Sequence, residues 1–174
     1  IILTFLILML LYSNNNIPII ENLNGFLGIY SIGFIPGLIF TSFVYLSIMN
    51  AINLTDGIDG YLAIFSIYFF ISFLRIHDIN TSYTLASVSV ILIATCIIFI
   101  RYNFSKGKKL FMGDAGSLFI GFWMATFLVT HITWATTSNV VQVFSIKPEN
   151  MPVIAISMIS IPVMDTLRVM FVRA

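Results

Sequence analysis

Two short stretches of an otherwise apolar chain hold the side chains that could do chemistry. The first, Asn50–Gly60, reads NAINLTDGIDG, and the second, Phe111–Ser117, reads FMGDAGS. Polar residues recur at every third position of the first stretch: Asn50, Asn53, Asp56 and Asp59. Positions three apart share one face of a helix. We therefore expect these four side chains to form a polar ladder.

The ladder predicts a divalent metal ion. Two carboxylates this close repel each other unless a cation or hydrogen-bond donors compensate their charge. Oxygen ligands with no Cys or His nearby favour Mg²⁺ or Mn²⁺. Taken singly, each Asp or Asn is more simply explained as a helix cap. A cap needs one residue, however, and the ladder has four.

Asp114 stands where a helix should begin, because an apolar run follows it directly. A helix N-terminus offers unpaired N–H groups and a partial positive charge, which suit a phosphate. Gly113 and Gly116 would let a ligand approach the backbone. Asp114 could then hold a metal that bridges phosphates, although a plain N-cap would explain this motif alone equally well. The nearby Lys106, Lys108 and Lys109 fit either nucleotide binding or membrane anchoring.

Asp165 follows Pro162 inside an otherwise apolar run. An ionisable residue within a membrane segment is a functional candidate by default. Arg168 lies one helical turn later, and a simple ion pair between the two residues is an equal alternative.

The elements that must position these residues lie in a membrane. Of the 174 residues, 59% are hydrophobic and 9% are charged, and the mean hydropathy is +1.04. Soluble domains carry roughly 25% charged residues. The net charge of +1 says nothing about nucleic acid, but no basic stretch is long enough to follow a phosphate backbone, so we expect no nucleic-acid partner. The single cysteine, Cys96, lies in an apolar run, where we expect it to fill a helix position.

The apolar runs predict an all-α polytopic membrane protein with about six transmembrane helices. The first is short, and the chain begins without Met, so we expect a fragment of a longer protein, forming a single integral-membrane domain over residues 1–174. Between the first two runs, apolar residues around Asn24-Gly25 suggest a short outer β-hairpin. The runs are Ile1–Tyr12, Pro36–Met49, Tyr61–Leu74, Tyr83–Ile100, Leu118–Trp134 and Pro152–Val172.

Because successive helices cross the membrane in opposite directions, Asn50–Gly60, Arg101–Asp114 and the C-terminal end fall on one side of it. Six of the eight Lys and Arg residues also fall on that side, which the positive-inside rule assigns to the cytoplasm. Four of the seven acidic residues join them: Asp56, Asp59, Asp114 and Asp165. Topology therefore predicts one acidic site at the cytoplasmic face.

The two stretches resemble the signature motifs of the polyprenyl-phosphate N-acetylhexosamine 1-phosphate transferases, which are multi-spanning membrane enzymes of the glycosyltransferase family 4 type. FMGDAGS and Ile161–Asp165 are more similar to the branch that transfers N-acetylglucosamine 1-phosphate to undecaprenyl phosphate. They are less similar to the phospho-N-acetylmuramoyl-pentapeptide transferase branch of peptidoglycan synthesis, which remains an alternative.

The resemblance implies that a lipid phosphate attacks the sugar-bearing phosphate of a UDP-N-acetylhexosamine and that UMP leaves, with Mg²⁺ screening the oxygens. This would be the first step of a lipid-linked glycan, at the cytoplasmic face of a bacterial inner membrane. A homodimer is left open. The implied catalytic residues are Asp56, Asp59 and Asp114, with Asp114 and Asp56 as metal ligands. The implied substrate-binding residues are Asn50, Asn53, Phe111, Gly113 and Asp165, with Phe111 packing on the uracil ring.

The chain also departs from the family pattern. It contains neither the adjacent Asp-Asp pair nor the His-rich motif of the family, so we expect it to be inactive by itself. Two other classes stay open: a transporter with interfacial carboxylates, and a non-catalytic membrane fragment that assembles with partners. A transporter would place polar residues at mid-membrane, whereas here they gather at one interface.

Overall fold

The computed structural model describes residues 19–76, 83–105, 109–134 and 147–173, and it confirms the all-α prediction. Neither of the two strands expected around Asn24-Gly25 is formed in these residues. The described residues contain five α-helices: α2 (Phe34–Thr55), α3 (Tyr61–Ile76), α4 (Tyr83–Asn103), α5 (Gly113–Thr133) and α7 (Met151–Arg173). Two 3₁₀ turns, η1 (Phe26–Gly28) and η4 (Pro148–Asn150), complete it.

Each of the last five predicted apolar runs is a helix. α2, α4, α5 and the segment Pro148–Val169 are long and apolar enough to cross a membrane. α3, with 16 residues, is shorter, and at 1.5 Å per residue it covers about 24 Å. The first predicted run, Ile1–Tyr12, lies outside the described residues, so the expected total of six is left untested.

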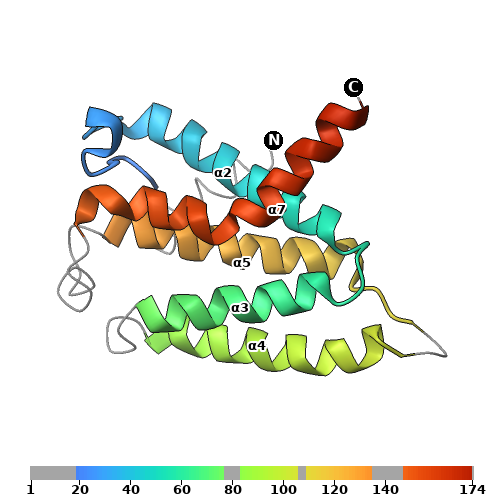
Figure 1. Cartoon of the computed structure of the whole chain (residues 1–174). Coiled ribbons are helices and arrows are strands. Elements are labelled where there is room, and N and C mark those ends of the chain that lie inside the picture. The colour runs from blue at the N-terminus through green and yellow to red at the C-terminus, as the bar shows by residue number, and fades with distance from the viewer. Residues whose placement is uncertain (1–18, 77–82, 106–108, 135–146, 174) are drawn as a thin grey trace.

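α5 lies at the centre of the bundle, with α2 and α7 on one side of it and α3, followed by α4, on the other (Figure 1). Its buried residues continue from Met124 to Ile132. α2 approaches it very closely, because a Cβ atom at Gly121 would lie only 2.8 Å from the Met49 Cα atom. In the buried interface the Tyr45 hydroxyl hydrogen-bonds the Thr126 hydroxyl at 3.0 Å. A small residue and a polar pair therefore set the spacing of α2 and α5.

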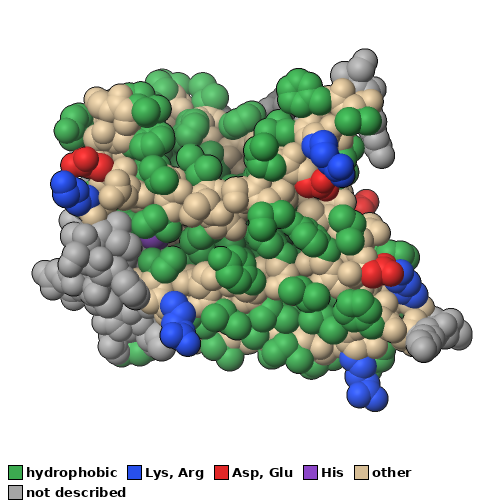
Figure 2. Space-filling model, viewed as in Figure 1, with side chains coloured by type: hydrophobic (Ala, Val, Ile, Leu, Met, Phe, Trp, Pro, Cys, Tyr) green, Lys and Arg blue, Asp and Glu red, His purple; other side chains and the backbone are tan. Residues whose placement is uncertain are grey.

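Successive helices run in opposite directions, so the 56–60 loop, the end of α4, the start of α5 and the end of α7 all lie at one end of the bundle (Figure 1). This confirms the same-side prediction for the two polar stretches. Figure 2 shows charged side chains gathered at the two ends of the helices, with hydrophobic side chains over the surface between them. Such a band suits the hydrocarbon core of a bilayer.

The segment expected to form a β-hairpin is a loop closed by a single antiparallel bridge between Asn22 and Ser31. Asn24 and Gly25 take positive φ angles of 57° and 89°, which reverse the chain, and η1 occupies the turn that the bridge closes. The Asn24 amide donates to the Ile132 carbonyl at 3.0 Å. The loop is therefore fastened to the far end of α5 rather than extended as a ribbon.

Candidate functional site

The first polar stretch spans the end of α2 and the loop after it. α2 continues to Thr55, so Asn50 and Asn53 lie on its last two turns and Asp56 is its C-cap. Asp59 lies beyond the helix, in a loop that ends at Gly60 with a φ of +71°. The predicted ladder therefore stops at Asp56, because the chain turns before another helical turn can place Asp59 on the same face.

Asn53 connects this stretch to the second one. Its amide nitrogen donates to the Asp114 carboxylate at 3.1 Å and to the Ser117 hydroxyl at 2.8 Å. Ser117 is buried and also donates to the Gly113 carbonyl at 3.0 Å. The close crossing of α2 and α5 brings these groups within reach, so two motifs far apart in sequence form one polar cluster.

Asp56, in the first polar stretch, caps the N-terminus of α5, which begins in the second stretch. Its carboxylate accepts hydrogen bonds from the backbone N–H groups of Gly113 at 2.8 Å and Met112 at 3.2 Å. The first N–H groups of a helix have no partner within the helix, and the helix dipole favours a negative charge there. Gly113 has a φ of +72°, a conformation that glycine adopts without strain. The Asp56 carboxylate is thus compensated by backbone donors.

Asp59 forms an ion pair with a lysine instead of joining Asp56 in the predicted ladder. Its carboxylate forms an ion pair with Lys109, whose amino nitrogen also lies 5.4 Å from the centre of the Phe111 ring. The side chains of the ion pair are partly exposed, and Phe111 is 52% exposed. These three residues form an open rim beside the Asn53–Asp114 cluster. Lys106 and Lys108 lie outside the described residues.

Asn103, at the end of α4, belongs to this site although the sequence analysis did not single it out. It is only 3% exposed. Its side-chain oxygen accepts from the Gly60 N–H at 2.6 Å, and its amide donates to the Leu110 carbonyl at 2.7 Å. A lone Asn that ends an apolar run carries no spacing pattern, so only its place beside the basic loop could have drawn attention to it.

Asp165 lies at the same end of the bundle, on α7. It pairs with Arg168 through contacts of 3.1 and 3.2 Å, which is the ion pair that the sequence left as an alternative. It is also within electrostatic range of Tyr61, whose hydroxyl oxygen is buried and has no hydrogen-bond partner among the described residues. Within the described part of the chain, no hydrogen bond or ion pair joins Asp165 to the other three acids.

Asp114 is the acid best placed to hold a metal ion. It is exposed in the first turn of α5, and one of its oxygens accepts from Asn53. No group of three or more His, Cys, Asp or Glu side chains that could hold a metal occurs in the described residues. Mg²⁺ is commonly held by one or two carboxylates together with substrate phosphates and water. The donors present fit an ion that arrives with a phosphorylated substrate.

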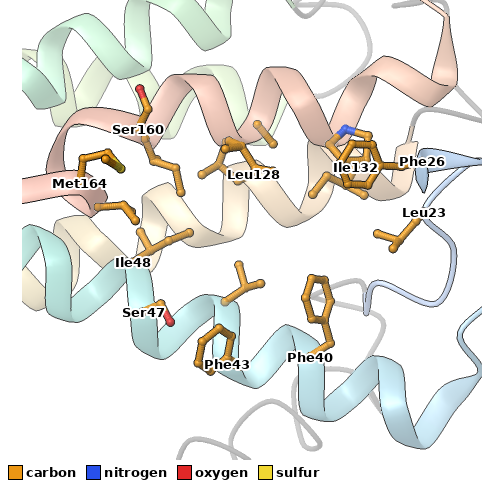
Figure 3. Close-up of a pocket in the computed structure, with 16 residues that line it drawn as sticks. Leu23, Phe26, Phe40, Phe43, Ser47, Ile48, Leu128, Ile132, Ser160 and Met164 are labelled. Atoms are coloured by element: carbon orange, nitrogen blue, oxygen red, sulfur yellow. The ribbon is translucent and has the colours of Figure 1, made fainter. Parts of the chain in front are cut away.

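An apolar groove of about 320 Å³ runs along α2 and α7 (Figure 3). It lies between α2 and α7, with Leu128 and Ile132 of α5 on its floor. Leu23 and Phe26 line it near the outer loop, and Ser47, Ile48, Ser160 and Met164 line its other end. On α2, Ser47 and Ile48 lie within one helical turn of Asn50. On α7, Met164 directly precedes Asp165.

Comparison with known proteins gives one result. The family model described as glycosyl transferase family 4 matches residues 1–132 of the chain. The matched region contains both polar stretches and Asn103, and it ends before α7. No curated protein and no solved structure has significant similarity to the chain.

Proposed function

Because the chain belongs to glycosyl transferase family 4, we propose that it transfers an N-acetylhexosamine 1-phosphate from a UDP-sugar to a polyprenyl phosphate. An oxygen of the lipid phosphate bonds to the sugar-bearing phosphorus of the donor. The bond from that phosphorus to the bridging oxygen breaks, and UMP leaves with that oxygen. A lipid-linked diphospho-sugar remains.

The observation that carries this proposal is the junction of the two motifs. Asn53 bonds Asp114 and Ser117, while Asp56 bonds the backbone at Gly113. Phosphoryl transfer depends mainly on positioning the reactants and on compensating the charge of the phosphates. A fixed cluster of amide, carboxylate and hydroxyl groups beside a helix N-terminus can supply both.

Each residue of the cluster then has a distinct role. Asn50 and Asn53, at the end of α2, contact phosphate or nucleotide. Asp114 and Asp56 approach the diphosphate from α5 and α2, and the space beside the Gly113 Cα atom is open to it, since a Cβ atom there would meet nothing within 4 Å.

On the rim, the exposed ring of Phe111 packs on the uracil. Asp59 and Lys109 lie beside that ring and complete the donor end of the site. Asp165, on α7, faces the acceptor.

Mg²⁺ or Mn²⁺ is the cofactor that this donor set favours, because its ligands are oxygen atoms. Asp114 would hold the ion, with Asp56 beside it. When bound, the ion supplies charge compensation for the phosphate oxygens. Asn53 holds the Asp114 carboxylate in place by its hydrogen bond, so that the carboxylate is already oriented before substrate arrives.

The groove between α2 and α7 supports a polyprenyl phosphate as the acceptor. Its lining is made up almost wholly of hydrophobic side chains, and Met164, at one end of it, directly precedes Asp165 on α7. An isoprenoid chain in this groove would carry its phosphate to the level of the polar cluster. Burial of apolar surface stabilises such binding by roughly 25 cal/mol per Å².

The basic residues support a cytoplasmic orientation of the site. Arg101, Lys109 and Arg168 all lie at the end of the bundle that carries the polar cluster. The positive-inside rule assigns that end to the cytoplasm, where nucleotide sugars are available. The resemblance of the two motifs to enzymes that use undecaprenyl phosphate favours a bacterial inner membrane as its location.

The test is release of UMP by membranes that contain the intact protein. UDP-N-acetylglucosamine and undecaprenyl phosphate are added together, and each is then omitted in turn. We expect UMP only when both substrates and Mg²⁺ are present. UMP release without the lipid, or none with both substrates, would contradict the proposal.

A further inference from the structure

The end of α4 joins the two functional loops without carrying a reactive group itself. Asn103 is the last residue of α4, and its buried side chain holds Gly60 at 2.6 Å and Leu110 at 2.7 Å. Gly60 directly follows Asp59, and Leu110 lies between Lys109 and Phe111. One amide group therefore fastens both sides of the rim.

These contacts close a ring. From Asn103, one side passes through Gly60 to Asp59, and the other passes through Leu110 to Lys109. The ion pair between Asp59 and Lys109 completes it. An exposed ion pair alone contributes about 0–1 kcal/mol and does not fix two loops. The buried amide is the stronger constraint, because an unsatisfied buried polar group costs about 1–3 kcal/mol.

The surroundings of Gly60 make the junction rigid. A Cβ atom at Gly60 would lie 2.4 Å from the ring of Phe104, the residue after Asn103. Phe104 therefore covers the turn at Gly60, while Asn103 bonds its N–H. Asparagine fits this place because it offers an acceptor and a donor in one planar group. A carboxylate lacks the donor, and an aliphatic side chain lacks both.

We propose that Asn103 is a positioning residue that holds Asp59, Lys109 and Phe111 in fixed register and so determines how tightly the UDP-sugar is bound. This inference rests on the proposed function for the identity of the ligand. α4 lies on the opposite side of α5 from the groove between α2 and α7 (Figure 1). Asn103 therefore affects the nucleotide donor and leaves the lipid acceptor unaffected.

The experiment compares Asn103→Ala with wild type in the intact membrane protein. We expect the KM for the UDP-sugar to rise about tenfold. The KM for the lipid phosphate should change by less than about twofold. Ser89→Ala is the matched control, because Ser89 is also buried on α4 but its hydroxyl donates within its own helix, to the Leu85 carbonyl. A donor KM unchanged in Asn103→Ala, or a lipid KM raised equally, would overturn the proposal.

Asn103→Asp separates positioning from simple loss of folding. When protonated, the introduced carboxyl can donate to the Leu110 carbonyl and accept from the Gly60 N–H, as the amide does. We expect its donor KM to approach the wild-type value as the pH falls, while that of Asn103→Ala does not. The ratio of the two variants cancels every pH effect that both variants share. A ratio that stays constant with pH would contradict the role of the donor hydrogen bond.

Amide hydrogen exchange tests the contact without any assay of activity. Exchange in residues 56–60 and 109–113 should become at least about tenfold faster in Asn103→Ala. Exchange around Tyr45 and Thr126 should stay at the wild-type rate, which would show that the bundle is intact. If the wild-type protein releases no UMP, the proposed function fails, and the exchange measurement alone decides whether Asn103 holds the two loops together. Unchanged exchange in both loops would overturn the inference.

Discussion

The Asp56 carboxylate lies 2.8 Å from the backbone nitrogen of Gly113 and accepts its hydrogen bond. This contact joins the C-cap of one membrane helix to the first residue of another. The backbone N–H groups at a helix N-terminus need such an acceptor, because they have no partner within the helix. Asp56 therefore has a structural role in assembling the site as well as its proposed role beside the diphosphate.

Asp56→Asn tests this double role. The substitution leaves one oxygen acceptor and turns an NH₂ group toward the remaining backbone N–H. We expect a stability loss of about 1 kcal/mol, as for other lost N-caps, and a fall in UMP release of about 100-fold. Thermal unfolding and initial rates measure the two effects. Glu149→Gln, at the other end of the bundle, is the control. Wild-type rates in Asp56→Asn would remove Asp56 from the site.

Asp114→Asn should abolish transfer with little effect on folding. Asp114 is exposed, and an amide can still accept the hydrogen bond from Asn53. Loss of its charge would weaken the hold on a divalent ion, so we expect a fall in rate of at least about 100-fold. The Mg²⁺ concentration needed for half-maximal rate should rise in the residual activity. An unchanged Mg²⁺ requirement would show that Asp114 is not the metal ligand.

Much of the fold could be predicted, because a bilayer allows few solutions for long apolar runs. The runs beginning near Pro36, Tyr61, Tyr83, Leu118 and Pro152 are all helices. Their alternation placed the two polar stretches at one end, as observed. The sequence predicts that a helix begins at Asp114, and α5 begins one residue earlier, at Gly113. α2 continues beyond the apolar run that ends at Met49, because Asn50 and Asn53 interrupt that run without interrupting the helix.

The contacts within the site could not be predicted, because they depend on how the helices pack. Spacing alone suggested that Asp59 continues the ladder, but the turn that ends at Gly60 takes it to Lys109 instead. The bond from Asp56 to Gly113 requires α2 and α5 to cross closely, and that crossing depends on Gly121. Asn103 was missed for the same reason: its partners become neighbours only after α3 and α4 have packed.

Gly121→Val tests whether the close crossing of α2 and α5 assembles the site. The added side chain would begin 2.8 Å from the Met49 Cα atom, and backbone cannot yield as a flexible side chain can. Overpacking of this kind costs about 1–3 kcal/mol. We expect lower thermal stability together with loss of UMP release, since Asn53 would no longer reach Asp114. Ala94→Val, at an exposed position of α4, is the control.

A full rate in Gly121→Val would show that the polar cluster forms without the close contact. Amide hydrogen exchange in Gly121→Val shows which part of the site is disturbed when activity is lost. If exchange at residues 56–60 and 109–113 stays slow while the rate falls, the rim is intact and the defect lies between Asn53 and Asp114.

Ala155→Trp tests the groove as the binding site of the acceptor chain. Ala155 lines the groove on α7, facing α2, so an indole there would fill part of its volume of about 320 Å³. We expect the KM for undecaprenyl phosphate to rise about tenfold, since much of the apolar contact would be lost. The KM for the UDP-sugar should stay the same, because the rim is distant from this residue.

A short-chain polyprenyl phosphate, which would not extend as far as Ala155, should be used equally well by variant and wild type. Ile97→Trp, at an exposed position of α4, controls for the added indole. If both lipids lose affinity equally, the groove binds something other than the chain of the acceptor, and the lipid must approach from another face.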